Sequence, residues 1–225
     1  MIKDLDEQIK LLRKEVKRFE DPVLEQFDQN PFHVLISCIL SLRTRDETTE
    51  PVSHRLFALA DNPWDIAKLD IRKIEKAIYS VNFYKTKARR IKDICKILVE
   101  KYDSKVPDTI EELLKFKGVG RKTANIVVTC AYNKDGIAVD THVNRISNRL
   151  GWVDTKNADQ TEMELRKILP KKYWIDTNYL FVKFGQNFCK PINPSCEKCS
   201  LIKYCNFGPG YLATKLEKLN TNKNK

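Results

Sequence analysis

A pair of glycines interrupts a helical stretch of this chain and limits what it can fold into. Gly118 and Gly120 follow a short segment in which Asp108 and Glu111 stand at the spacing of a helix capping box. The segment after the glycines, residues 121–132, is largely apolar and predicts a second, buried helix. The sequence therefore predicts two helices joined by a tight glycine turn.

Such a turn suits a phosphate group and can present a reactive amine. Glycine lets a ligand approach the backbone closely, and the free N–H groups that open the second helix carry the positive end of its dipole. Lys122 lies in that first turn, beside Arg121. The dipole and the neighbouring guanidinium both favour the neutral form of the Lys122 amine, which is a nucleophile.

Paired glycines also occur in two other contexts. A dinucleotide-binding fold is excluded, because a helix rather than a strand precedes Gly118 and Thr123 stands where a third glycine is required. A plain turn between two helices, without any function, stays open on the glycines alone. Asp140 favours a functional site, since it is placed to cap the helix predicted over residues 143–150 and to lie near the Lys122 turn. An ordinary capping aspartate is compatible with both interpretations.

Four cysteines gather within seventeen residues near the carboxyl end, with no histidine among them. The members of this group are Cys189, Cys196, Cys199 and Cys205. Four thiolates so placed can bind one tetrahedral centre, either a zinc ion or an iron–sulfur cluster, and the spacing leaves both open. The other cysteines, Cys38, Cys95 and Cys130, fall in apolar helical patterns and are predicted core residues.

The formal net charge of +11 points to a polyanionic partner, although it also suits a membrane surface. The apolar run over residues 34–42 is too short to cross a bilayer, which needs about 20 residues, so no membrane-spanning segment is expected. The first ten residues carry charges of both signs, which disfavours a signal peptide. We expect an intracellular protein of the cytoplasm or nucleoid.

Apolar residues recur at helical spacing along most of the chain, and no strand-like alternation extends beyond a few residues. The predicted fold class is therefore all-α, with about ten helices. Helices are expected over residues 5–19, 32–42, 46–60, 86–102 and 143–150, the second of them at the centre of the fold. Lys87 is expected on an exposed helix face, and Asp159 with Glu162 is expected to start a later helix. The tail from Thr214 to Lys225 is expected to be disordered.

Residues 118–142, GVGRKTANIVVTCAYNKDGIAVDTH, resemble the helix-hairpin-helix motif and the following loop of the endonuclease III family of DNA glycosylases. The resemblance places Lys122 on that family's catalytic lysine and Asp140 on its catalytic aspartate. Lys117 stands where the family usually carries a proline. The spacing of the four cysteines resembles the [4Fe–4S] loop of the same family, which favours that cluster over zinc as the cofactor.

The resemblance also implies which residues contact DNA. Four residues of the hairpin and one lysine of the cysteine loop would bind the duplex, namely Gly118, Val119, Gly120, Arg121 and Lys190. Arg43 stands where relatives usually carry a glutamine that fills the gap left by a flipped base, and Phe83 where they carry an apolar wedge. An exposed arginine and a core aromatic are the plain alternatives. Asp46 resembles the family's buried structural aspartate and is expected to cap a helix.

The architecture implied by the resemblance has two lobes. One is a six-helix barrel over residues 22–133 that ends in the hairpin, and the other is an iron–sulfur cluster domain built from residues 1–21 and 134–225. The implied function is that of a monomeric, bifunctional DNA glycosylase and AP lyase of base excision repair. It would remove oxidised pyrimidines from damaged double-stranded DNA and cut the strand by β-elimination through a lysine Schiff base. A mismatch- or adenine-specific monofunctional glycosylase and a non-catalytic DNA-binding module are the alternatives.

Overall fold

The computed structural model describes residues 2–19 and 29–223, and these residues form helices without any strand. The all-α prediction is therefore confirmed. The chain divides into two compact units, one of Asp21–Ala138 and one of Met1–Glu20 with Val139–Lys225. We call them the hairpin unit and the cysteine unit, after the motifs that they contain. The predicted lobe boundary at Pro22 lies outside the described residues.

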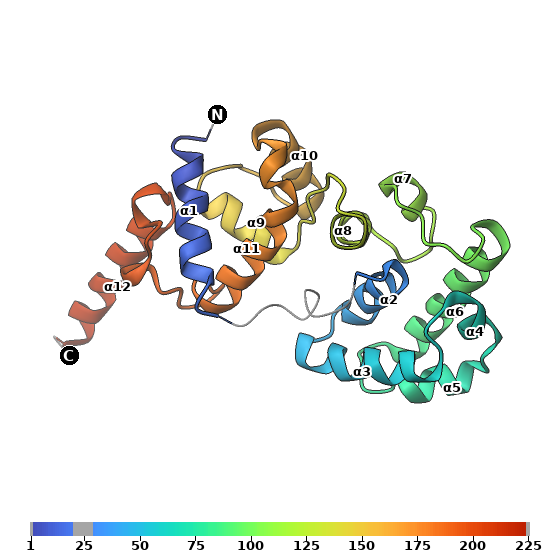
Figure 1. The fold of residues 1–225 in the computed structure, drawn as a ribbon. Coiled ribbons are helices and arrows are strands. Elements are labelled where there is room, and N and C mark those ends of the chain that lie inside the picture. Colours follow the sequence, from blue (N-terminus) through green and yellow to red (C-terminus); the bar gives the residue numbers. More distant parts are fainter. Residues whose placement is uncertain (1, 20–28, 224–225) are drawn as a thin grey trace. The chain divides into compact units, whose positions relative to one another are not determined.

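The hairpin unit is built around one buried helix, α2 (Pro31–Ser41), which is labelled in Figure 1. The Asn30 side chain caps it by accepting a hydrogen bond from the Phe32 N–H at 2.9 Å, and a proline follows as its first residue. Nearly every side chain of α2 is buried. The prediction of a central helix in this segment is confirmed.

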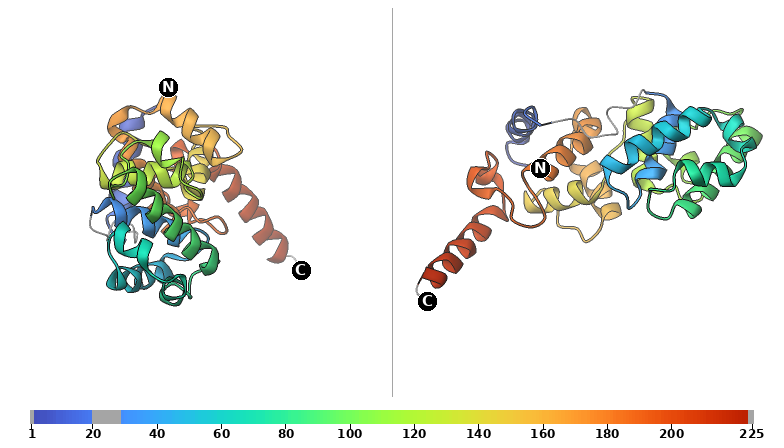
Figure 2. Two further views of the ribbon diagram at one scale, coloured as in Figure 1. Left: turned by 90° about the vertical axis from the view of Figure 1, so that its right-hand side faces the viewer. Right: turned by 90° about the horizontal axis from the view of Figure 1, so that it is seen from below.

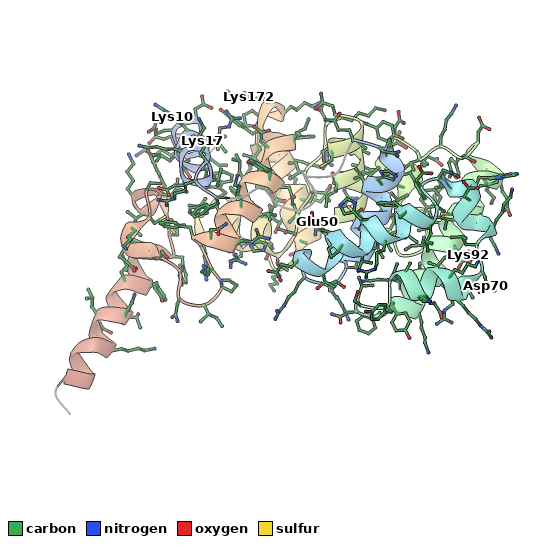
Figure 3. All side chains as sticks on the ribbon, turned by 60° about the horizontal axis from the view of Figure 1, so that its bottom comes forward. Lys10, Lys17, Glu50, Asp70, Lys92 and Lys172 are labelled. Carbon is green, nitrogen blue, oxygen red and sulfur yellow. The ribbon has the colours of Figure 1, made fainter. Side chains whose placement is uncertain are left out.

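The remaining helices of the hairpin unit follow α2 along the chain. They are α3 (Asp46–Leu59), α4 (Pro63–Lys68), α5 (Ile71–Ala77), α6 (Tyr84–Lys101), α7 (Ile110–Leu113) and α8 (Arg121–Ile126), with the π-helical turn η2 (Val127–Ala131) at the end. α2 packs against α3, α6, α8 and η2. Asp70 is the N-cap of α5, and Figure 3 labels it close to Lys92 of α6. The Lys92 ammonium donates a hydrogen bond to the carbonyl of Leu69, the residue before this cap.

The helix predicted over residues 121–132 divides into two parts, because its hydrogen-bonding pattern changes after Ile126. The Thr129 hydroxyl donates to the carbonyls of Asn125 and Ile126, at 2.8 and 3.2 Å. Such bonds from a hydroxyl back to the preceding turn commonly bend helices, and a π-helical turn often accompanies a functional segment. The prediction that this segment is buried is confirmed.

The start of α7 corrects the predicted capping pair. Thr109, and not Asp108, is the N-cap, and its hydroxyl accepts a hydrogen bond from the Glu112 N–H at 3.4 Å. The Asp108 carboxylate instead accepts a hydrogen bond from the Lys134 ammonium, which holds the pKa of Asp108 below its usual range. An ion-pair partner distant in sequence thus draws the carboxylate away from the helix end.

The cysteine unit packs α1 (Leu5–Val16) against a carboxyl-terminal set of helices (Figure 1). The set consists of α9 (Thr141–Arg149), α10 (Ala158–Ile168), η3 (Lys171–Tyr173), α11 (Trp174–Asn187), η4 (Cys196–Lys198), η5 (Ile202–Tyr204) and α12 (Gly208–Lys223). The Trp152 indole donates a hydrogen bond to the buried Gln8 side chain at 2.8 Å, which joins α1 to the segment after α9. Lys10, Lys17 and Lys172, labelled in Figure 3, are exposed around this unit.

The start of α10 corrects a second predicted cap. Asn157 rather than Asp159 is the N-cap, and its side chain accepts a hydrogen bond from the Gln160 N–H at 3.0 Å. The side chain of Gln160 accepts a hydrogen bond from the N–H of Lys156, one residue before the cap, which resembles the reciprocal bond of a capping box. Glu162 is instead buried inside the helix and pairs with Arg166 at 2.9 Å.

The described part of the predicted tail, residues 214–223, is helical rather than disordered. Residues 214–223 belong to α12, which runs outward from the rest of the cysteine unit in Figure 2. The prediction relied on missing apolar periodicity, but Leu212 and Leu216 stand four residues apart, and lysine, leucine and glutamate favour helix even on a surface. Leu216 is 61% exposed, while Leu212 is half-buried and α12 packs against η4.

No helix among residues 2–19 and 29–223 combines the length and apolar character needed to cross a bilayer.

Candidate active site and cysteine cavity

The hairpin turn before α8 requires its first glycine. Gly118 has a left-handed backbone, with φ of 91°, and a Cβ atom built on it would lie 2.9 Å from the Arg90 side chain. Gly120 is the N-cap of α8, has open space around it and offers no side-chain cap. Val119, between them, is buried. The turn therefore presents backbone N–H groups, and the Val119 side chain belongs to the core.

Lys122 projects from the first turn of α8. Its side chain is partly exposed, and within the described part of the hairpin unit its amine has no hydrogen-bond or ion-pair partner. Burial raises the pKa of the Cys38 thiol to about 12, and the positive charge of Lys122 opposes that rise. The Lys122 amine thus lies within electrostatic range of α2. An amine that no carboxylate holds is available to a ligand.

Asn125 fixes the start of α8 against the chain that returns after the π-turn. This side chain is fully buried, donates to the Arg121 carbonyl at 2.9 Å and accepts from the Ile137 N–H at 3.0 Å. Gly136 leaves room for it, because a Cβ atom there would come within 2.9 Å of the Asn125 amide oxygen. A polar residue inside an apolar helical run was the available sequence signal for this role.

Asp140 caps α9 in the cysteine unit. One carboxylate oxygen, Oδ1, accepts hydrogen bonds from the N–H groups of His142 and Val143, both at 2.8 Å. The prediction that Asp140 is an N-cap is confirmed. The second oxygen has no hydrogen-bond partner among the described residues of this unit. The carboxylate is held in one orientation by its helix and keeps one oxygen for a ligand.

Two arginines anchor α9 to the cysteine loop. Arg145 donates to the carbonyls of Gly185 and Cys189, at 3.3 and 3.0 Å, and its burial lowers its pKa. Arg149 donates to the Cys189 sulfur at 3.3 Å and to the Lys190 carbonyl at 2.8 Å. The helix that Asp140 opens is therefore fixed, one and two turns later, by the loop that carries the cysteines.

The four cysteines of the loop line one small pocket, together with apolar side chains that include Ile146 of α9 and Phe184 of α11. Burial raises the pKa of the Cys199 thiol to about 12, and burial with the neighbouring sulfurs raises that of Cys196. A metal centre would have to displace these protons, as thiolate ligation always does. No three cysteine, histidine or acidic side chains in the described ranges converge on a single-ion site.

Arg43 and Phe83 occupy the tips of two neighbouring loops in the hairpin unit. Both have a left-handed backbone, with φ of 55° and 58°, although neither is glycine. Phe83 is 63% exposed, so the alternative of a core aromatic is wrong. The Arg43 guanidinium lies 5.9 Å from the centre of the Phe83 ring. The structure therefore brings together two candidate DNA-contacting residues that lie forty residues apart in the sequence.

The other predicted site residues are placed less tightly. Lys190 is exposed on the cysteine loop, and Arg121 is partly exposed at the start of α8. α3 begins at Asp46, whose side chain lies outside the described part of the structure. Lys87 was expected to be exposed and is instead 3% exposed, because acceptors from other segments surround its ammonium. No sequence spacing signals that burial.

Comparison with known proteins gives one family. Residues 36–171 match the family described as HhH-GPD superfamily base excision DNA repair protein. Endonuclease III of Thermotoga maritima is 49% identical over 197 residues, which cover 88% of this chain and 91% of that protein. A solved non-covalent endonuclease III–DNA complex is 35% identical with a TM-score of 0.85, covering 95% of this chain and 100% of that one. A trapped endonuclease III–DNA covalent intermediate is 38% identical with a TM-score of 0.82, covering 92% and 98%.

Those extents of similarity span both units, and the all-helical fold agrees with them. The chain belongs to the endonuclease III family, within the HhH-GPD superfamily of base excision DNA repair proteins.

Proposed function

We propose that this chain is a bifunctional DNA glycosylase and AP lyase of base excision repair that acts on oxidised pyrimidines through Lys122. The observation that carries the proposal is the Lys122 amine, which projects from a glycine hairpin and has no partner in the described part of its unit. Family membership supplies the reaction class. Monofunctional glycosylases do not need such an amine, which is why Lys122 favours a lyase.

The first part of the mechanism is capture of the duplex. The hairpin around Gly118 and Gly120 offers backbone N–H groups to a phosphate, and Arg121 and Lys190 add positive charge. The exposed Phe83 ring enters the stack where the damaged nucleotide leaves it, and Arg43 faces the base left behind. In this proposal, the lobe of residues 22–133 binds lesion and backbone, and the lobe of residues 1–21 and 134–225 adds Asp140.

The second part is displacement of the base. The neutral Lys122 amine attacks C1′ of the sugar, the C1′–N bond breaks, and the base leaves with a proton. The C1′–O4′ bond of the sugar then breaks, O4′ takes up a proton and the nitrogen loses one, which leaves an imine between Lys122 and C1′. Loss of a C2′ proton expels the 3′ phosphate, and water later hydrolyses the imine and frees the lysine. The Asp140 carboxylate stabilises the positive charge that develops on the sugar or accepts a proton from Lys122. The proposal requires DNA to engage both residues at one nucleotide.

The proposed cofactor is a [4Fe–4S] cluster, which the four cysteines of the loop would hold. Four cysteines that line one pocket support a shared metal centre, and membership of the endonuclease III family favours a cluster over one zinc ion. When bound, the cluster would supply a structural link among Cys189, Cys196, Cys199 and Cys205. Arg149, which already donates to the Cys189 sulfur, would offset the negative charge of the thiolates. Freshly purified protein should then absorb broadly near ~400 nm, whereas zinc protein would not.

Borohydride trapping tests the chemistry directly. Wild-type protein is mixed with a duplex that contains thymine glycol, and the covalent protein–DNA adduct and strand scission are measured with and without borohydride. Lys122→Ala should abolish both. Lys117→Ala is the matched control, because Lys117 is an exposed lysine of the same hairpin, and it should keep both activities. Scission by Lys122→Ala would exclude Lys122 as the nucleophile of the lyase. If wild type gave neither adduct nor scission, the lyase would be excluded, and release of the base would then distinguish a monofunctional glycosylase from a DNA-binding module. The chain should act as a monomer in the cytoplasm or nucleoid.

A further inference from the structure

A buried lysine lies directly behind the exposed Phe83. Lys87 belongs to the first turn of α6, and its backbone N–H donates to the Phe83 carbonyl at 3.0 Å. The residue is 3% exposed. Removing an ammonium group from water is costly unless hydrogen bonds replace the lost hydration, so its partners must account for its presence.

Those partners belong to the end of α2 and to the loop that follows it. The Lys87 ammonium donates to the Leu40 carbonyl at 2.7 Å and to the Thr44 hydroxyl at 2.9 Å. Leu40 lies in the last turn of α2, which contains no basic residue of its own. A cation is favoured at that end of a helix, so α6 supplies α2 with the missing charge. Burial and the charge of Arg90 lower the pKa of Lys87 to about 8.

The same hydrogen bonds tie together the two loops of the proposed DNA contact. Thr44 follows Arg43, and its hydroxyl also accepts a hydrogen bond from the Asn82 N–H at 3.3 Å. The Asn82 side chain in turn donates to the Arg43 carbonyl. Because Asn82 precedes Phe83, a continuous chain of hydrogen bonds runs from the Lys87 ammonium through Thr44 to the backbone of both loop tips.

Both loop tips are held in an unfavourable backbone conformation. A left-handed residue other than glycine is sterically strained, because its Cβ crowds the following carbonyl oxygen, and Arg43 and Phe83 are both of this kind. Such residues persist only where their surroundings hold them. The side chains that they present are exposed, so the strain does not serve core packing.

We infer that Lys87 is a positioning residue that, through Thr44 and Asn82, joins Arg43 and Phe83 into one preformed wedge for the gap left by the extruded nucleotide. This inference rests on the proposed function of those two residues. A preformed wedge enters DNA without the entropy loss of ordering two separate loops at the moment of binding. Lys87 itself does not contact DNA, since its ammonium is enclosed by its protein acceptors.

Lys87→Met tests the inference, because methionine fills nearly the same space without a donor. Base release from a thymine glycol duplex is measured in single turnover, with 2-aminopurine opposite the lesion to report its unstacking. Lys87→Met should slow base release about 10-fold or more and reduce the fluorescence rise. Lys92→Met is the matched control, because Lys92 is another lysine of α6 whose ammonium donates to a carbonyl, but its acceptor is Leu69, which belongs to neither loop. It should leave both readouts unchanged.

A double-mutant cycle separates positioning from a general loss of structure. If Lys87 acts through the wedge, Lys87→Met should add little to Phe83→Ala, whose wedge is already missing. Equal slowing by Lys87→Met in both backgrounds would overturn the inference. The inference would also be overturned if Phe83→Ala released the base slowly while Lys87→Met released it at the wild-type rate. If instead Phe83→Ala and Arg43→Ala both act normally, the proposed role of the loops is wrong. Should Lys87→Met fail to fold, Thr44→Val, with Thr44→Ser as its rescue, answers the same question.

Discussion

The helices α8 and α9 begin in opposite ways, although each carries one of the two charged residues of the proposed reaction. α8 starts at Gly120 without a side-chain cap and has the cation Lys122 in its first turn. α9 starts at Asp140, whose carboxylate accepts two N–H groups of the helix. The helix dipole disfavours the first arrangement and favours the second.

The difference separates chemistry from stability. Lys122 stands where a cation weakens its own helix, so folding provides no reason for it, and a site that uses the amine does. Asp140 stabilises the helix that it opens, so its structural role hides any chemical one. Substitutions at the two helix starts should therefore affect activity alike and stability in opposite directions.

Lys122→Ala gives the largest expected effect. Strand cleavage at an abasic site should fall on the order of 10³-fold or more, since the nucleophile is lost. The free energy of unfolding should rise by a few tenths of a kcal/mol, because a cation leaves the start of α8. Gel assays of cleavage and urea unfolding measure the two. A clear loss of stability would mean that Lys122 holds its unit together and would break the comparison.

Asp140→Asn should come next. Asparagine caps a helix about as well as aspartate, so unfolding should change little, while base release should fall about 10²-fold with the loss of charge. Asp140→Ala should lose the same activity and about 1 kcal/mol of stability besides. Asn157→Ala, at the capped start of α10 in the same unit, is the control and should lose only stability. Full activity of Asp140→Asn would reduce Asp140 to a structural cap.

The two helix starts also differ in how far the sequence could predict them. Asp140 and its helix follow from local spacing, and the structure confirms the cap. The Gly118 turn is also local, since a tight turn needs a left-handed residue. The prediction that Asp108 caps α7 was wrong, because the Asp108 carboxylate binds Lys134, which is distant in sequence, and Thr109 is the cap. Local patterns cannot show such partners.

The buried charges were beyond sequence reasoning for the same reason. Lys87 fits the polar side of an amphipathic helix, and only the meeting of α6 with the end of α2 reveals its acceptors. Likewise, the spacing of the cysteines predicts a shared site, but the donation from Arg149 to the Cys189 sulfur depends on how α9 packs. The prediction of a disordered tail was wrong for a different reason, because it underestimated the helix propensity of the residues in α12.

Lys87 extends the comparison to a third helix start, where a cation is compensated by hydrogen bonds. Its pKa of about 8 in the folded chain lies below the ordinary 10.5, so between those values the unfolded chain holds a proton that the folded chain has released. Stability should therefore rise with pH in that window, relative to Lys87→Met, by about 2 kcal/mol. Urea unfolding of both proteins at pH 7.5 and pH 10 measures the difference. If the stability of wild type relative to Lys87→Met stayed constant or fell between pH 7.5 and pH 10, the burial of this charge would be contradicted.

Thr109→Ala gives the smallest effect and the sharpest control for the comparison. Thr109 caps α7, a helix start in the hairpin unit that carries no proposed chemistry. Losing the cap should cost about 1 kcal/mol of unfolding free energy, and Thr109→Ser should recover most of it. Borohydride trapping should stay at the wild-type level in both variants, because Lys122 is fixed by the separate hydrogen bonds of Asn125. If trapping fell with the cap, the start of α8 would depend on α7 through the hairpin, and the activity of Lys122 could no longer be treated as independent of helix stability.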